Sequence, residues 1–521
     1  MDFNNINNIP AEKFEFSTSR DLAHDTKLDT KPISYFKGAF RRFCKNKGAV
    51  VGGIVVSLLI LFAIIAPFFT PFTPGYYDMS FAYVSPKLPL FDALGIDFWD
   101  GCKTKNTNRI GYLKDLALGT EIGKDVIKDG EYVSLDGTNY TYRFDTYAGV
   151  GFGKYKIISQ QKYEDIQRYQ NETGKQILYP IVEFSKRPTL EKNKYDANIY
   201  YVMENKDATI IRPKLDSNGN IIPNYWKYEA ESPSSVMATY NSLRIEGENG
   251  IIDSDGTQYF YVYGRLVDGG IEVRAEYYEY YIYEHTQEKK DGIAEPLFVF
   301  GTTDTGKDIF ACLSYGARFS FIFATLVAVV NFIVGVIYGS IAGYFGGKTD
   351  LFMERFSEIL GAVPSMIVIT LLKYHMGSSS QAIVLFIAFF VTGWISMAGT
   401  TRMQFYRFKN QEYVLAARTL GASDRRIMFK HIFPNGLGTI VTSVALVIPS
   451  MIYSETSLSY LGIINLEAGN TTSVGTLIAA GQKSILANAS FVALFPCLFL
   501  VLLMLSFNLF GNGLRDAFNP S

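Results

Sequence analysis

The chain has 521 residues, of which 48% are hydrophobic and 15% aromatic, and its formal net charge is −1 at pH 7. These values exclude a single uniform soluble domain, and the near-neutral charge gives no reason to expect nucleic acid as a partner. The average instead combines long apolar runs with a polar stretch that holds most of the tyrosines.

The N-terminal region is polar, then basic. We expect residues 1–33 to form a disordered cytoplasmic tail, and residues 34–74 a cytoplasmic lead-in and the first transmembrane helix. The basic residues before this helix, with no acid among them, are Lys37, Arg41, Arg42, Lys45 and Lys47. Such clusters mark the cytoplasmic side. The alternative is a cleaved signal peptide, but the apolar run begins only at residue 49 and lacks a small-residue cleavage pattern, which favours an uncleaved anchor.

Five uncharged runs are long enough to cross a hydrocarbon core of about 30 Å at about 1.5 Å per residue. They are residues 49–77, 319–347, 376–401, 432–454 and 484–514. A sixth run is shorter, because only 14 uncharged residues separate Glu358 from Lys373, and it must borrow its ends from flanking sequence. We therefore predict an all-α polytopic membrane core of six helices, with both termini in the cytoplasm and residues 75–300 outside.

Residues 75–300 hold 26 of the 35 tyrosines among charged and turn residues, with no run long enough to span. The reversal dipeptides are Asp136-Gly137, Asn218-Gly219 and Asp255-Gly256. The stretch 259–284 predicts a hairpin, in which Asp268-Gly269 joins two tyrosine-rich runs of strand-forming residues. The stretch 161–174 predicts a helix that ends at Gly174. We expect an extracytoplasmic α+β insert domain.

The cysteines and histidines indicate neither a disulfide framework nor a metal site. Cys102 is the only cysteine within residues 75–300, so no disulfide can form inside the insert. The histidines are scattered without ligand spacing: His24, His285, His375 and His431. We expect no metal and no cofactor bound by this chain.

The stretch GTTDTGKD, residues 301–308, resembles a phosphate-binding loop through Gly301, Gly306 and Lys307. Asp308 stands where that loop needs a Ser or Thr hydroxyl for Mg²⁺, and its carboxylate would face the phosphates with like charge. The predicted topology also places the stretch outside, away from cytoplasmic ATP. We therefore expect no nucleotide site and no ATPase activity in this chain.

A basic stretch, residues 402–435, separates two predicted spans. Seven basic residues between positions 402 and 430 outnumber two acidic ones, which again indicates the cytoplasmic face. We predict a helix over 412–420, a break at Gly421, and a second helix that Ser423 caps, with Asp424 in its first turn. The second helix is expected to run through Ile432, with Pro434 beginning the next span.

This helix-turn-helix has two possible roles. Small residues that leave room for close approach are Ala416, Ala417 and Gly421. Ile427 and Met428 are candidate apolar anchors for a groove on a cytoplasmic partner. The alternative is an interfacial amphipathic helix that lies on lipid headgroups. The physical pattern does not decide between them.

The stretch AARTLGASDRRIMFKHIFPN resembles the coupling-loop signature of ABC importer permeases, in the form typical of oligopeptide and dipeptide (OppC/DppC-type) permeases. Other segments resemble this family in the same order along the chain: RRFCKNKGAVVGG, FGTTDTGKDIF, YGARFSF, AGYFGGKTDLFMER, ETSLSYLG and NLFGNGLRDAFNP. The resemblance covers residues 34 to 520 except the insert. It therefore explains residues 301–308 as a family segment.

The resemblance implies a type I ABC importer permease fold, with a permease core over residues 301–521 and a coupling loop over about 402–435. It implies a homologous second permease as heterodimer partner, two cytoplasmic ATPases that bind ATP and Mg, an extracellular substrate-binding protein, and the lipid bilayer of a bacterial cell membrane. The implied coupling residues are Glu412, Ala416, Ala417, Gly421, Ser423 and Asp424. Leu415 departs from the family, which has a glutamate there, so the ionic detail of docking does not carry over.

Several alternatives stay open. An importer of nickel or another small solute belongs to the same family; a receptor with an external sensor and a membrane-embedded enzyme are disfavoured, and no catalytic residue is expected. Glu455 is a candidate path or gating residue, or an interfacial glutamate in ordinary solvent. Two roles are possible for a set of prolines and glycines in the predicted spans: they either bend the helices for transport or serve only packing. These residues are Pro364, Pro449, Gly335, Gly339 and Gly343. The insert is either a spacer or a site that handles substrate or binding protein.

Overall fold

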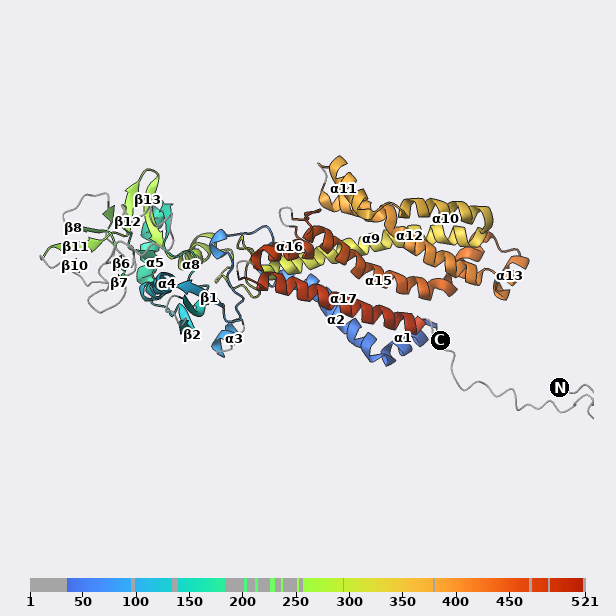
Figure 1. The fold of residues 1–521 in the computed structure, drawn as a ribbon, viewed down its shortest axis with the longest axis horizontal. Coiled ribbons are helices and arrows are strands. Elements are labelled where there is room, and N and C mark those ends of the chain that lie inside the picture. The colour runs from blue at the N-terminus through green and yellow to red at the C-terminus, as the bar shows by residue number, and fades with distance from the viewer. Residues whose placement is uncertain are drawn as a thin grey trace, which may run out of the picture.

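A computed structural model shows an elongated molecule in which a bundle of long helices carries the insert at one end (Figure 1). The structure describes residues 35–94, 99–133, 139–182, 201–203, 211–213, 225–229, 236–237, 251–252, 256–293, 295–377, 380–467, 471–485 and 488–518. The predicted N-terminal tail, His24, and the dipeptides Asp136-Gly137 and Asn218-Gly219 lie outside these residues.

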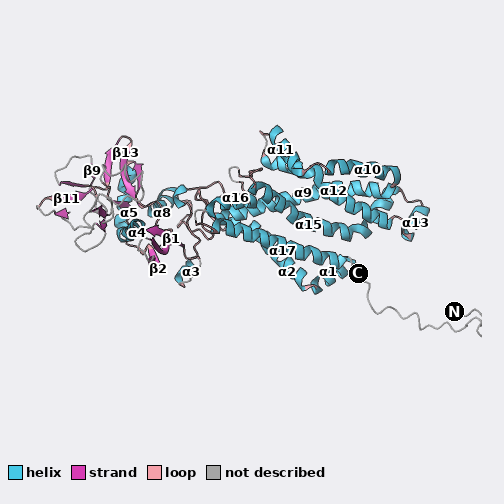
Figure 2. Cartoon of the chain, in the orientation of Figure 1, coloured by secondary structure: helices cyan, strands magenta, loops and turns pink. Residues whose placement is uncertain are grey.

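Five helices of the bundle are long and apolar enough to cross a membrane. They are α2 (Lys47–Ile65), α9 (Ile309–Phe345), α12 (Gln381–Phe408), α15 (Phe433–Tyr460) and α17 (Phe491–Phe518). Figure 2 shows that helices make up this whole part of the molecule. The sequence therefore predicts correctly that the core is a helical membrane bundle.

The expected third span is a bent pair of helices. α10 (Gly347–Gly361) and α11 (Ser365–His375) meet at an angle of 70°, with Pro364 directly before α11. Proline disfavours a helical conformation at the preceding residue, which accounts for the break. Within the described residues five helices could therefore cross a membrane, or six if the bent pair crosses as one, and the count of six stays a prediction.

Glycines set the close packing of the bundle. A Cβ at Gly339 would lie 2.2 Å from the backbone oxygen of Ala398, and one at Gly335 would lie 2.7 Å from Met397 Cβ, so α9 meets α12 at backbone distance. Gly52 meets the Ser506 oxygen in the same way, where α2 contacts α17. Packing, the second reading of the α9 glycines, is confirmed for these positions.

Shorter elements surround the bundle: α1 (Tyr35–Lys45), α13 (Glu412–Thr419), α14 (Asp424–Arg426), a π-helical turn (Ile427–Ile432) and α16 (Val474–Ile485). The last lies at the insert end, between α15 and α17 (Figure 1). A Cβ at Gly481 would lie 2.6 Å from Ala493 Cα, so α16 sits directly on the first turns of α17.

The described part of the insert contains strands and helices. One sheet has the order β1-β3-β2 (Cys102–Asn108, Asn139–Asp145, Ile127–Val133), and a second has β4-β13-β12-β9 (Lys154–Ile158, Gly270–Ala275, Gly264–Val267, Val236–Met237) with β5 (Leu178–Tyr179) paired to β13. Two small sheets consist of β10-β11-β8 (Ile251–Ile252, Gln258–Tyr261, Lys227–Glu229) and β6-β7 (Tyr201–Met203, Ile211–Pro213). The helices are α3 (Pro89–Ala93), α4 (Arg109–Ile122), α5 (Gln160–Thr173) and α8 (Tyr277–Tyr283). Short 3-10 or π turns occur at Ala66–Phe68, Met79–Phe81 and Glu284–Lys289.

Two local predictions for the insert are confirmed. α5 ends at Gly174, whose φ of 71° and backbone bond to Gln170 are those of a left-handed cap. The hairpin turn at Asp268-Gly269 joins β12 to β13 in antiparallel register, with Val267 opposite Gly270. A reversal also separates β10 from β11, where Gly256 has a φ of 84°, although Asp255 lies outside the described residues.

The prediction that the second tyrosine-rich run forms a strand is wrong beyond Ala275, where β13 ends. Residues 277–283 form helix α8 instead of continuing the strand. Tyr277, Tyr280 and Tyr281 recur at helical spacing and are all buried, so the helix places them on one face against the insert core. Packing of this face therefore outweighs the strand preference of tyrosine.

Two segments connect the insert to the bundle and form its base: residues 69–84, which follow α2, and residues 298–308, which precede α9. Phe72, Phe81 and Phe298 are buried in one hydrophobic core with Tyr281 of α8. The Tyr83 amide donates to the Thr303 oxygen at 3.1 Å, and the Thr302 amide to the Val84 oxygen at 3.0 Å. The core of the insert is thus continuous with the segments that join it to α2 and α9.

Candidate functional site

The helix-turn-helix predicted from the basic stretch is present at the end of the bundle remote from the insert (Figure 1). α13 ends before Gly421, whose φ is 79°, and α14 begins after Ser423. Of the predicted coupling residues, Ala417 is half-buried and the others are exposed: Glu412, Ala416, Gly421, Ser423 and Asp424. The structure brings these residues to one surface.

Two details of that prediction are wrong, whereas the break at Gly421 is confirmed. Ser423 takes the cap position, but its side chain makes no capping hydrogen bond. The second helix does not end at Ile432; a π-helical turn joins it to α15, so helical structure continues from Asp424 to Tyr460. No Cβ contact occurs within 4 Å at Gly421, so the left-handed backbone there, and not lack of space, is what requires glycine.

Ile427 and Met428 are not available as anchors for a partner, which corrects the prediction from sequence. They are 1% and 5% exposed and pack in a cluster with Val414, Phe405 and Tyr344. The cluster ties the helix-turn-helix to the ends of α9 and α12. Leu420, which is 88% exposed, and the exposed Leu415 present apolar surface instead.

Tyr344 at the end of α9 holds the turn by polar contacts. Its hydroxyl donates to Asp424 Oδ1 at 2.6 Å and accepts from Arg418 Nη2 at 3.3 Å. These two residues come from α14 and α13, so one phenol connects both helices to α9. Because Asp424 makes this bond, its carboxylate has a structural role within the chain.

A second polar cluster joins α10 to the last turns of α12. Arg402 of α12 binds Asp350 in bidentate fashion at 2.6 and 2.7 Å and reaches Glu354 at 2.9 Å, both on α10. Tyr406 also donates to Asp350 at 2.6 Å. Paired, bidentate contacts of this kind fix the orientation of α10 against α12.

Glu455 is buried near the insert end of α15, at 1% exposure. Its carboxylate accepts hydrogen bonds from Ser320 of α9 at 3.2 Å and from Ser459 at 3.1 Å, and it lies 3.0 Å from a Cβ built at Gly475 of α16. The solvent-exposed alternative is therefore wrong. Glu455 instead joins α15 to α9 through the Ser320 bond and packs closely against Gly475 of α16.

In the segment that resembles a phosphate loop, the amides that could bind a phosphate already bond a side chain of the same segment. Asp308 caps α9, accepting from the Phe310 and Ala311 amides at 3.1 and 3.2 Å, so its carboxylate takes the place where a phosphate would sit. A Cβ at Gly306 would lie 1.8 Å from the Asp78 oxygen, which shows that this glycine serves close backbone contact. Lys307 forms an ion pair with Glu467.

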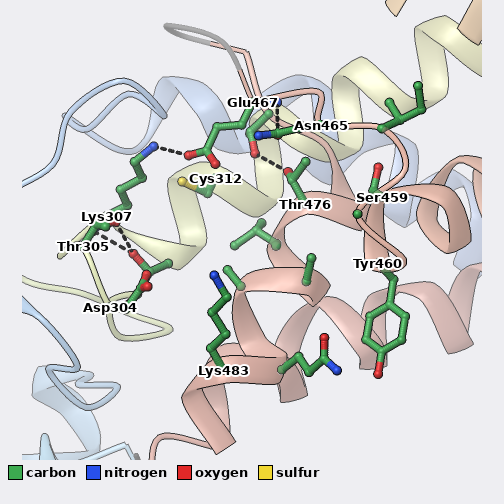
Figure 3. Close-up of a pocket in the computed structure, with 18 residues that line it drawn as sticks. Asp304, Thr305, Lys307, Cys312, Ser459, Tyr460, Asn465, Glu467, Thr476 and Lys483 are labelled. Atoms are coloured by element: carbon green, nitrogen blue, oxygen red, sulfur yellow. Dashed lines mark hydrogen bonds and ion pairs between the residues drawn. The ribbon is translucent and has the colours of Figure 1, made fainter. Parts of the chain in front are cut away.

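A pocket of about 490 Å³ opens at the insert end of the bundle (Figure 3). Its walls come from the 303–307 loop, the start of α9, the end of α15 and its following loop, and α16. Its charged residues are Asp304, Lys307, Glu467 and Lys483. The remaining walls are largely threonine, serine, alanine and amide side chains.

The insert contains a buried ionic cluster. Arg274 pairs with Glu121 at 2.6 Å, and their side chains are 4% and 2% exposed. Burial raises the pKa of nearby Glu276 to about 7, with Lys124 at 3.1 Å opposing the shift. Among the described residues no group of histidine, cysteine or acidic side chains could hold a metal ion.

Comparison with known proteins identifies the bundle. A family model described as the binding-protein-dependent transport system inner membrane component matches residues 335–521, and one described as the N-terminal TM domain of oligopeptide transport permease C matches residues 34–86. The oligopeptide transport system permease protein OppC of Bacillus subtilis is 43% identical over 221 residues, covering 42% of this chain and 71% of the relative. The chain belongs to this permease family.

Other relatives agree with this assignment. The dipeptide permease DppC of Bacillus subtilis is 40% identical over 42% of this chain and 68% of the relative, and that of Lactococcus lactis is 39% identical over 44% and 66%. The two family models leave residues 87–334 of the permease unmatched. The family models therefore account for the bundle except most of α9, while most of the insert must be interpreted from its own residues.

Sequence reasoning missed Tyr344, Arg402 and Asp350 as site residues. In the sequence Arg402 is only one of the basic residues of the 402–435 stretch, and its partner Asp350 lies 52 positions away. No local pattern signals such a pair, because the contact depends on how α10 folds back on α12.

Proposed function

We propose that this permease imports oligopeptides or dipeptides as a subunit of an ATP-driven transporter. The relatives are oligopeptide and dipeptide transport permeases, which supplies the substrate class. The observation that carries the transport role is the exposed helix-turn-helix at one end of a membrane bundle, fixed to α9 and α12 by the Ile427 cluster and by Tyr344. Rigid attachment of this kind is what a docking element needs to transmit force to the spans.

In the proposed assembly this chain pairs with a homologous second permease, docks two ATPases at the helix-turn-helix, and receives substrate from an extracellular binding protein. The chain itself catalyses no bond change. It crosses a bacterial cell membrane six times, with α10 and α11 as a broken third span and with both termini inside. The α+β insert then lies outside, above the outer mouth of the path.

We further propose that the insert handles the loaded binding protein. Its position is the main support, because its base connects directly to the ends of α2 and α9 (Figure 1). Tyrosine provides large contact area with a polar tip at interfaces. Several tyrosines are buried in the insert core, however, so only the exposed ones, such as Tyr77 at 63%, count toward this argument.

The test is reconstitution of the permease with its partner subunits in proteoliposomes. Uptake of a labelled tripeptide that requires both ATP and the loaded binding protein supports the proposal. Uptake of nickel under the same conditions, without peptide uptake, would replace it with the small-solute alternative. Peptide uptake that proceeds without the ATPases would contradict the mechanism.

A further inference from the structure

The charges in the outer pocket are not all neutralised within the chain. Lys307 and Glu467 form an ion pair across one side of the pocket (Figure 3). Asp304 and Lys483 also line it, and within the described residues neither side chain has a hydrogen bond or ion pair. The pocket therefore presents one half-buried carboxylate and one exposed ammonium group that are available to a ligand.

These two groups come from different walls. Asp304 lies on the loop that precedes α9, whereas Lys483 belongs to the last turn of α16. Figure 3 shows the Lys483 side chain directed into the space between α16 and that loop. The separate elements hold the opposite charges apart, so a ligand with two separated charges matches them.

The neutral part of the pocket is also suited to a peptide. Gln482 supplies an amide group on one wall. The hydroxyls of Thr303 and Thr305 bond each other, and that of Thr476 bonds the Ser473 oxygen, so a peptide would share or replace these bonds. A peptide backbone carries one donor and one acceptor per residue and needs such partners when it leaves water. The volume of about 490 Å³ falls within the range of about 300 to 1,000 Å³ that is typical of small-ligand sites.

We infer that this pocket receives a zwitterionic peptide as it leaves the binding protein, with Lys483 holding the terminal carboxylate and Asp304 the terminal ammonium. The inference rests on the proposed function and adds a site and a chemical basis for recognition. Charge-assisted hydrogen bonds to each terminus favour free peptides over blocked ones. The ion pair of Lys307 with Glu467 keeps the remaining two charges from competing for the ligand.

The experiment uses the complete reconstituted transporter and compares a tripeptide with its C-terminal amide, both at concentrations that saturate the binding protein. Lys483→Gln is expected to lower uptake of the free tripeptide about tenfold and that of the amide less than twofold. Asp304→Asn should show the same selectivity with the N-acetylated peptide. Lys290→Gln, which removes an exposed lysine of the insert outside the pocket, is the matched control.

A second measurement tests the charge itself. In a background without the native cysteines, Lys483→Cys should lose uptake of the free tripeptide, and an aminoethyl disulfide adduct that restores the positive charge should recover it. A neutral methyl disulfide adduct should not.

The outcomes separate this inference from the proposed function. If the parent transporter imports neither peptide, the proposed function fails. If the parent imports the free peptide and Lys483→Gln does so equally well, the pocket assignment fails and the function stands. An equal loss for free and amidated peptides, or failure of the aminoethyl adduct to restore uptake, would overturn the carboxylate contact and assign Lys483 to a structural contact, such as one with the second permease.

Discussion

The hydroxyl of Tyr344 donates a 2.6 Å hydrogen bond to Asp424 Oδ1, 80 positions further along the chain. Tyr344 lies in the last turn of α9, and Asp424 opens the helix that continues into α15. One bond thus joins the proposed docking element to two spans. Since Asp424 is exposed, water competes for this bond and limits its contribution.

Tyr344→Phe removes the bond to Asp424 and the one from Arg418 while keeping the ring. We expect a loss of about 1 kcal/mol in local stability of the turn and an increase of several-fold in ATP hydrolysed per peptide imported. The measurement is the ratio of the two rates in proteoliposomes. Tyr374→Phe is the control, because Tyr374 is 83% exposed on α11. A ratio equal to that of the parent would contradict a coupling role for the Tyr344 bond.

Gly421→Glu is expected to uncouple ATP hydrolysis from uptake while the membrane fold stays intact. The side chain has space within this chain, so the effect comes from the φ of 79° and from the docking partner. Gly421→Ala should therefore weaken the turn by about 1 kcal/mol, whereas Gly421→Asn, which tolerates the left-handed region better, should cost less. If the glutamate variant transports at the parent rate, the docking assignment is wrong.

Glu455→Gln keeps an oxygen that can accept from Ser320 and Ser459 but removes the negative charge. If the charge serves transport, uptake should fall several-fold while the yield of assembled complex stays the same. Glu455→Leu also removes the acceptor and should lower the yield, because it leaves two buried hydroxyls without this partner. Parent-like uptake by the glutamine variant across pH would restrict Glu455 to a packing role.

The insert is expected to lose stability as the pH rises from about 4.5 to about 7. The pKa of Glu276 is raised to about 7 by burial, so in this interval the folded state retains a proton that the unfolded state releases. The total effect is about 3 kcal/mol, and stability should level off above pH 7. Hydrogen exchange of β13 and α8, corrected for intrinsic rates, measures it. Glu276→Gln should remove the pH dependence, whereas Glu279→Gln, which alters the other carboxylate near Lys124, should keep it.

The proposed role of the insert is tested by two deletions. Replacing residues 83–284 by a flexible linker should impair delivery from the binding protein, but it also removes Tyr147 and Tyr281, which pack against Phe298 and Phe81. A shorter deletion of residues 183–260 avoids this problem, because the Ile181 amide already bonds the Val262 oxygen at 2.7 Å, so the new ends are close. Assembly with the ATPases is checked first. Peptide import with unchanged affinity and rate in both variants would make the insert a spacer.

Periodicity and local turn chemistry predict much of this fold. The apolar runs mark the bundle, and Gly174 and Gly421 mark turns that need a left-handed backbone. The predictions that fail concern features that tertiary packing decides. The tyrosines of residues 277–283 have strand preference but form a helix, and Ile427 and Met428 have the composition of an exposed anchor but are buried against α9 and α12.

The candidate site shows the same division. The basic loop and its break are visible in the sequence, so the surface could be located, whereas the residues that fix it to the bundle could not. Tyr344 and Asp350 reach their partners across 80 and 52 positions. The pocket is likewise assembled from three separate stretches, and its unneutralised charges become apparent only when these lie together.

Helix α9 runs without a break from Ile309 to Phe345, and its 37 residues measure about 55 Å. At one end Asp308, which caps the helix, accepts a hydrogen bond from Thr70 in the base of the insert. At the other end Tyr344 donates to Asp424, next to the turn at Gly421. The helix contains no proline that would let its halves move separately. We therefore expect α9 to behave as a rigid rod, so that a displacement of the turn along its axis would reach the base of the insert with little loss of amplitude.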